Sequence, residues 1–134
     1  MPKFLRYLWA SPATLLGLCG VVLAILSGGR AQIVQGVVEA HGGLVTLFLR
    51  RGLFWMTSGA AAMTIGHVIL GCDQHCLART RRHEHVHVRQ YERWGPFMIP
   101  AYFLASFLAW RRGLDPYLDN PFEVEAFAID TPVD

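Results

Sequence analysis

The chain has 134 residues, enough for one domain with a single core. Hydrophobic residues make up 53% of the sequence and charged residues only 16%, below the roughly 25% usual for soluble domains, so a membrane-associated protein has to be considered. The net charge of +2 gives no reason to expect a nucleic-acid partner, and three cysteines are too few for a disulfide framework.

Residues 7–29 contain no charged side chain and have basic residues on both sides. As one helix they would span about 34 Å, enough to cross a bilayer core of about 30 Å. Ser11 as N-cap and Pro12 at the first helical position would instead begin a shorter helix at Pro12. We expect residues 7–29 to make the chain an integral membrane protein, with a buried core helix and a signal peptide as the alternatives.

The segment after Gly29 has the short alternating runs that are typical of strands. Two strands are predicted at about 31–34 and 37–41, with a turn at Gln35-Gly36. Residues 44–49 are apolar and fit either a strand or a short helix. Residues 63–70 are rich in β-branched side chains, alternate roughly, and are predicted to form one strand that ends at Gly71.

From about Gln74 the periodicity becomes helical, and a helix over 74–94 is predicted to end at Gly95-Pro96. It carries the pattern His83-Glu84-x-x-His87. Residues four apart lie on one face of a helix, so the two imidazoles can bind one metal ion. Glu84 lies close enough to reach a water molecule activated by that ion.

Two other surfaces are predicted around this helix. An apolar helix over 97–112 carries no charge before its end, so we expect it to be buried on every side or to contact lipid. Arginines form a separate stripe on the helix over 74–94, which we expect to face solvent or anionic lipid headgroups. The stripe consists of Arg79, Arg82, Arg89 and Arg93.

A catalytic zinc site needs a third protein ligand. Asn120-Pro121 predicts the start of a short helix, with Asn120 as N-cap. Glu123, in the first turn of that helix, is the best candidate for the third ligand, and Glu125 is the second. Glu123 also stands where a side chain could reach back to cap the helix, which is the competing interpretation.

Together, His83-Glu84-x-x-His87 and Asn120-Pro121-Phe122-Glu123-x-x-Ala126 resemble the gluzincin class of zinc metallopeptidases. In that class the Glu of the second motif is the third zinc ligand. The similarity is closest to minimal gluzincin-like proteins with His-Glu-x-x-His-x-x-Gln, matched here by Gln90. Related motifs often place Asp after the Ala, where this chain has Phe127, so support for the ligands must come from elsewhere. The candidates for that support are Asp119, Asn120 and Asp130.

The sequence thus predicts an α+β fold, with an N-terminal apolar helix in residues 1–29 and a minimal zincin-like domain in residues 30–134. That domain would hold a small sheet, the active helix and a C-terminal ligand helix. The resemblance implies a zinc-dependent peptidase that acts on a peptide or protein. Zinc (Zn²⁺) would be bound by His83, His87 and Glu123, with Glu84 as general base. The oxyanion donor expected from the resemblance is left open among Tyr91, Tyr102 and Tyr117.

Two other classes of protein fit the same residues. One is a membrane protein in which the three ligands bind zinc without catalysis, which the small size favours because little chain is left for a substrate cleft. The other is a metal-free membrane-surface protein that uses the arginine stripe and the apolar helices. Membrane lipid is a partner in every version.

Overall fold

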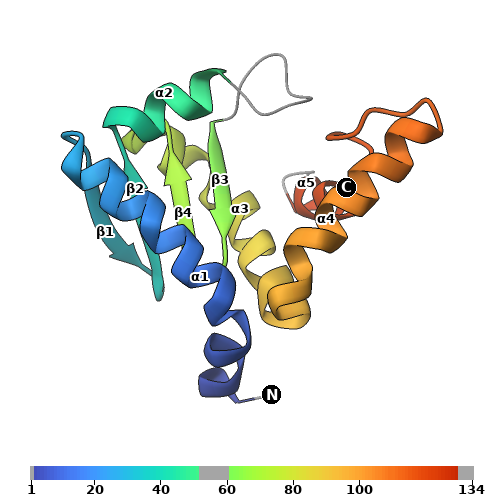
Figure 1. The fold of residues 1–134 in the computed structure, drawn as a ribbon, viewed down its shortest axis with the longest axis horizontal. Helices are drawn as coiled ribbons and strands as arrows, with labels where there is room; N and C mark the ends of the chain where they lie inside the picture. The colour runs from blue at the N-terminus through green and yellow to red at the C-terminus, as the bar shows by residue number, and fades with distance from the viewer. Residues whose placement is uncertain (1, 52–60, 130–134) are drawn as a thin grey trace.

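The computed structural model describes residues 2–51 and 61–129. Within these ranges the fold is mixed α+β, with five α-helices and a four-stranded sheet. The strands are β1 (Arg30–Val34), β2 (Val37–His41), β3 (Ala62–Ile65) and β4 (Val68–Gly71). The sheet order is β1-β2-β4-β3, in which the central pair β2 and β4 is parallel and the two outer pairs are antiparallel. β3 is therefore an edge strand (Figure 1).

The predicted hairpin of β1 and β2 is confirmed. Its turn has φ of 53° at Gln35 and 78° at Gly36, and positive φ at both central residues lets a two-residue turn follow the twist of the strands. Residues 44–49, left open between strand and helix, lie in the helix α2 (Gly43–Arg51).

The prediction of one strand over residues 63–70 was wrong. The segment is a second hairpin, in which β3 and β4 pair from Ile65 opposite Val68. Gly66 turns the chain with φ of 66°, a conformation that suits glycine. The turn is held by a contact distant in sequence, because the backbone N–H of His67 donates to the Thr14 hydroxyl at 3.0 Å. Alternation of β-branched residues could not reveal this break.

The two faces of the sheet are covered by different helices (Figure 1). Val68 and Leu70 pack with residues of α1 (Lys3–Leu26) and α2, whereas Ile69 packs with Leu77 and Val88 of α3 (Gln74–Trp94). Because successive side chains of β4 point to opposite faces of the sheet, this strand contributes to the core on both faces. The predicted bounds of α3 are confirmed, and Gly95 ends it.

α1 begins nine residues before the position that Ser11-Pro12 predicted, with Pro12 inside the helix. Proline cannot donate a hydrogen bond to the carbonyl of residue 8. The Ser11 hydroxyl donates to the Leu8 carbonyl at 2.7 Å and so satisfies the acceptor that Pro12 leaves. Ser11 therefore supports the interior of the helix instead of capping its start.

By length and composition α1 could cross a membrane, although signal sequences and core helices of soluble proteins meet the same criterion. Near its start, Trp9 donates its indole N–H to the Arg93 carbonyl and its ring lies 6.0 Å from that of Phe97. Phe97 belongs to a 3₁₀ turn, η1 (Gly95–Phe97), which leads into α4 (Met98–Arg111). α1 and α4 lie close together near η1 and diverge from there (Figure 1).

The sequence predicted that the helix over 97–112 is either buried on every side or in contact with lipid. The first of these alternatives is wrong, because α4 is not buried on every side. Met98, Ser106 and Ala109 are buried, while several large apolar side chains are exposed. The helix is followed by a turn-rich loop and by α5 (Pro121–Ala128), which packs on α3. The exposed side chains of α4 are Phe103, Leu104, Phe107, Leu108 and Trp110.

Candidate metal centre

His83 and His87 lie one turn apart on the buried face of α3. The centroids of their rings are 5.1 Å apart, and the rings are packed edge to face. The ring of Phe127 packs against His83 with centroids 4.4 Å apart, so this position, where related motifs often carry Asp, supplies packing. Spacing along one helix therefore brings both imidazoles to one place, as the sequence predicted.

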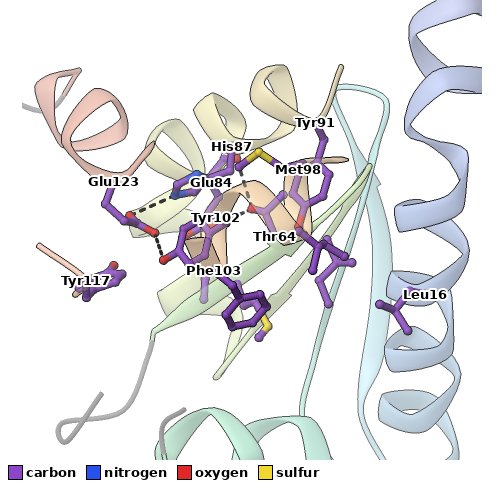
Figure 2. A pocket seen from close by; sticks show the side chains of 14 residues that line it. Leu16, Thr64, Glu84, His87, Tyr91, Met98, Tyr102, Phe103, Tyr117 and Glu123 are labelled. Atoms are coloured by element: carbon purple, nitrogen blue, oxygen red, sulfur yellow. Dashed lines mark hydrogen bonds and ion pairs between the residues drawn. The ribbon is translucent and has the colours of Figure 1, made fainter. Parts of the chain in front are cut away.

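Glu123 joins them from α5 (Figure 2). Its Oε2 atom lies 3.1 Å from Nε2 of His83 and 3.1 Å from Nε2 of His87. Its Oε1 atom accepts from the Tyr102 hydroxyl, and the backbone N–H of Asn120, which a capping side chain would reach, donates to the Tyr117 carbonyl at 3.2 Å. Asn120 itself caps the helix, because its side-chain oxygen accepts from the Phe122 N–H at 3.0 Å. The interpretation of Glu123 as a capping side chain is therefore wrong.

Asn120 also fixes the place from which Glu123 projects. It is fully buried, and its amide donates to the Tyr102 carbonyl at 3.1 Å and to the Ser106 hydroxyl at 2.9 Å. Both acceptors belong to α4, so the start of α5 is bound to that helix. Glu125, the second candidate ligand, is exposed and pairs with Arg93 at 2.7 Å.

The three side chains could hold a metal ion, since one ligand atom from each lies within 4.8 Å of the others. Within residues 2–51 and 61–129 no other group of three such side chains meets this criterion. Two imidazoles and one carboxylate form a donor set suited to zinc with an open coordination position. Bonds of about 2.0–2.2 Å to one tetrahedral ion place its ligand atoms roughly 3.4 Å apart. The distance of 3.1 Å from Oε2 of Glu123 to each Nε2 atom is close to this value.

Gln90 determines which nitrogen of His87 faces the other ligands. The Gln90 amide nitrogen donates to the Phe122 carbonyl at 3.0 Å, so its oxygen must point the other way. That oxygen lies 2.8 Å from Nδ1 of His87 and accepts a hydrogen bond from its N–H. Nδ1 therefore carries hydrogen, and in the neutral ring Nε2 offers a lone pair toward Glu123. A lone pair 3.1 Å from a carboxylate oxygen calls for a proton or a cation between them.

Without a cation, a proton fills this role. Burial opposes protonation of His87, but its hydrogen bond to Glu123 and the nearby carboxylates outweigh burial and raise its pKa to about 9. Burial would raise the pKa of Glu123, but hydrogen bonds from both imidazoles and Tyr102 lower it to about 2. The site thus favours a positive charge between imidazole and carboxylate.

Glu84 is buried beside the three candidate ligands and is hydrogen-bonded to a residue of β3. The Thr64 hydroxyl donates to Oε2 of Glu84 at 2.6 Å (Figure 2). Burial raises the pKa of Glu84, and this effect outweighs the lowering by the imidazoles and the Thr64 hydrogen bond. A buried carboxyl group with a raised pKa beside a ligand cluster is the arrangement expected of a proton-transferring group.

A cavity of about 260 Å³ adjoins Glu84, His87 and Glu123. All three tyrosines named from the sequence line it. Tyr102 donates its hydroxyl to Oε1 of Glu123 at 2.8 Å, so it orients a ligand. Burial, and then the charges of Glu123 and Glu84, raise the pKa of Tyr117, whose hydroxyl therefore stays protonated at neutral pH.

The support for the ligands differs from the sequence prediction. Asp119 accepts from the Asp115 N–H at 2.7 Å and so stabilises its own loop. Asn120 acts indirectly through the start of α5, and Asp130 lies outside the described residues. Direct support comes from Tyr102 and Gln90. Thr64 and the hydroxyl of Tyr102 have these roles only through packing across the fold, and no local pattern marks them.

We expect Gln90→Leu to lower zinc affinity by about 10–100-fold, the usual effect of losing an outer hydrogen bond to a metal ligand. Leucine keeps the volume but leaves Nδ1 of His87 unpaired. The measurement is competition for zinc against a fluorescent chelator. Gln32→Leu is the matched control. It also removes a glutamine hydrogen bond, the one from Gln32 on β1 to Glu39 on β2, but neither residue belongs to the candidate metal centre. Equal affinities of all three proteins would contradict the role of Gln90.

Comparison of the chain with protein families, with curated proteins and with solved structures found no significant match.

Proposed function

We propose that the protein is a membrane-associated, zinc-dependent peptidase of gluzincin-like type. The observation that carries the proposal is the buried carboxyl group of Glu84 next to the three ligands His83, His87 and Glu123, at the wall of a cavity. A purely structural zinc site needs no such group, and structural sites are usually closed by a fourth protein ligand.

The residues fit zinc in charge, atom type and separation, as argued above. A zinc ion bound there would supply Lewis-acid activation of water and of a substrate carbonyl. His87 is kept in the required tautomer by Gln90, and Glu123 is kept in place by Tyr102. These contacts fix the positions of the ligand side chains in the metal-free protein. Less free energy is therefore needed to order them when zinc binds.

Glu84 is the general base of the proposed reaction. Its carboxylate accepts a proton from the attacking water and then delivers that proton to the leaving amine. Thr64 orients it, because the hydroxyl hydrogen bond fixes one carboxylate oxygen of a side chain that lines the cavity. The raised pKa of Glu84 brings its proton affinity closer to that of the groups it serves.

The edge strand β3 supports a peptide as the substrate. All four of its residues, Ala62–Ile65, line the cavity that adjoins Glu84. On the side away from β4, an edge strand presents backbone N–H and C=O groups that can pair with an extended chain. A peptide bound in this way would cross the site next to Glu84. Tyr117, a protonated hydroxyl at the cavity wall, is the candidate donor to the developing oxyanion.

The membrane part of the proposal rests on α1, which has the length and composition of a membrane span. Lys3 and Arg6 precede the uncharged segment and would lie at the headgroups.

The test uses the full chain purified in mild detergent. We expect about one zinc per chain by elemental analysis, and cleavage of peptides in a mixed library, read by mass spectrometry, that stops with a chelator and returns with zinc. Zinc without cleavage would instead identify a non-catalytic zinc protein. Absence of zinc would exclude both.

A further inference from the structure

The cavity beside the site changes in character along its length. Thr64, Glu84, His87 and Glu123 of its lining lie together, since hydrogen bonds join Thr64 to Glu84 and His87 to Glu123. The remaining walls are mostly apolar and come from α1, β3 and α4. Leu16 of α1 and Phe103 of α4 line the cavity and are also 55% and 47% exposed, so they stand at its rim. Figure 2 shows Leu16 on α1 across the opening from Phe103.

Both rim residues belong to helices whose outer surfaces are apolar. In the most apolar 18-residue stretch of α1, only 28% of the residues are buried, although this helix packs on the sheet. Exposed apolar side chains in this number on two helices of a small protein indicate a contact with lipid or with another apolar partner. Besides the residues of α4 already named, the exposed apolar residues include Leu8, Leu15, Leu18, Val22, Leu23, Ile25 and Leu26 of α1.

The charges have a distribution that favours lipid as the covering partner. α1 carries Lys3 and Arg6 near its start and no charge after them, and α4 carries none before Arg111. Cationic side chains at the ends of apolar helices lie where headgroups would be. The arginine stripe of α3 is exposed as predicted, and α3 covers the opposite face of the sheet from α1.

The polar end of the cavity is placed differently. Tyr117 lines it from the loop between α4 and α5, and that loop carries exposed Asp115 and Asp119. Charged loops lie in water and not in the hydrocarbon core. The cavity therefore runs from a rim on lipid-facing helices to ligands near a hydrated loop.

From this arrangement we infer that the substrate is an apolar peptide segment held in the bilayer, which enters between α1 and α4 and is cut near the boundary with water. The inference rests on the proposed peptidase function and adds the substrate class and its route. The apolar walls bind side chains that arrive from lipid, while the scissile amide reaches Glu84 at the hydrated end.

The first test compares rim residues with adjacent exposed residues that do not line the cavity. Leu16→Gln is paired with Leu15→Gln, and Phe103→Gln with Leu104→Gln, so that each pair loses similar apolarity toward lipid. The full chain is reconstituted in vesicles of phosphatidylethanolamine and phosphatidylglycerol. Two substrates are compared. One is a membrane-spanning peptide that contains a peptide bond cleaved in the library experiment, and the other is a soluble peptide with the same residues around that bond.

We expect each rim variant to lower kcat/KM for the membrane peptide by about tenfold, the effect of weakening one buried apolar contact. The adjacent variants should change it less than about twofold, within the range of exposed substitutions. Unchanged cleavage in the rim variants would overturn the inference. So would equal cleavage of the soluble and membrane peptides by the reconstituted wild type, since the cavity would then open to water.

A second test measures binding without catalysis. Benzoylphenylalanine is placed at position 16, 103, 15 or 104 in the Glu84→Gln protein, and a biotinylated membrane-spanning peptide is added to the same vesicles. Cross-linking from 16 and 103 should exceed that from 15 and 104 and should be competed by unlabelled peptide. Equal, non-competed yields from all four positions would overturn the inference. If the rim positions cross-link but no peptide is ever cut, the peptidase proposal fails while the binding route stands.

Discussion

Glu84→Gln is expected to reduce kcat for peptide cleavage by about 10²–10⁴-fold, the contribution usual for general acid–base catalysis, while zinc stays bound. Glutamine fills the same volume, and its carbonyl oxygen can still accept the Thr64 hydrogen bond. It cannot take a proton from water. The measurement is kcat on a peptide found in the library, together with zinc content by elemental analysis.

The matched control for this variant is Glu125→Gln. Glu125 is exposed and its pairing with Arg93 lies at the surface, where such pairs contribute little. Its removal should leave kcat and zinc content unchanged. Full activity of Glu84→Gln would exclude Glu84 as the base, and loss of zinc in that variant would show that its carboxylate is needed for metal binding.

Zinc is expected to reverse the pH dependence of stability between about pH 6.5 and 9. In the metal-free protein the folded-state pKa of His87 is about 9, above its ordinary value of 6.5, so its contribution is complete below pH 6.5 and is lost as pH rises through 9. The folded-state pKa of Glu123 is about 2, below its ordinary value of 4.5, so its contribution is complete above 4.5 and is lost as pH falls toward 2. The contribution of this pair is therefore largest from about pH 4.5 to 6.5.

Zinc requires the unprotonated Nε2 of His87, so its binding displaces a proton and strengthens as pH rises toward 9. At 100 times the dissociation constant, zinc should add about 2.7 kcal/mol of stability. For a domain of this size that is roughly 10 °C in Tm. The measurement is thermal unfolding in detergent at pH 5.5, 7 and 8.5, with and without zinc.

The control for the pH experiment is Glu123→Gln, which removes both the partner that raises the pKa of His87 and the third ligand. In that variant the loss of metal-free stability above pH 6.5 should become smaller, because only Glu84 and Gln90 then favour protonated His87, and zinc should give a much smaller increase in Tm. A zinc effect that is the same at all three pH values would contradict the assignment of His87 as a ligand that must first lose a proton.

Several features of the fold follow from local sequence. Gln35-Gly36 predicted the first hairpin because two strand-like runs are separated by two residues, and glycine tolerates the positive φ that such a turn requires. The periodicity over 74–94 and Gly95 predicted both ends of α3. In contrast, Gly66 turns the chain between β3 and β4 with the support of Thr14, and Ser11 maintains α1 through Pro12. Propensity alone favoured one strand and a later helix start, and in each case a hydrogen bond that propensity does not include supports the observed structure.

For the site, the sequence by itself determined the pair His83 and His87 with Glu84 between them, since a helix fixes the relative positions of residues one to four apart. It also narrowed the third ligand to Glu123 or Glu125. Only the tertiary structure favours Glu123 as the candidate, because Asn120 binds α5 to α4 and the Glu123 carboxylate lies beside the imidazoles. Gln90, Thr64 and Tyr102 gained their roles in the same way. Separations between elements are set by packing of the whole chain, and no local pattern records them.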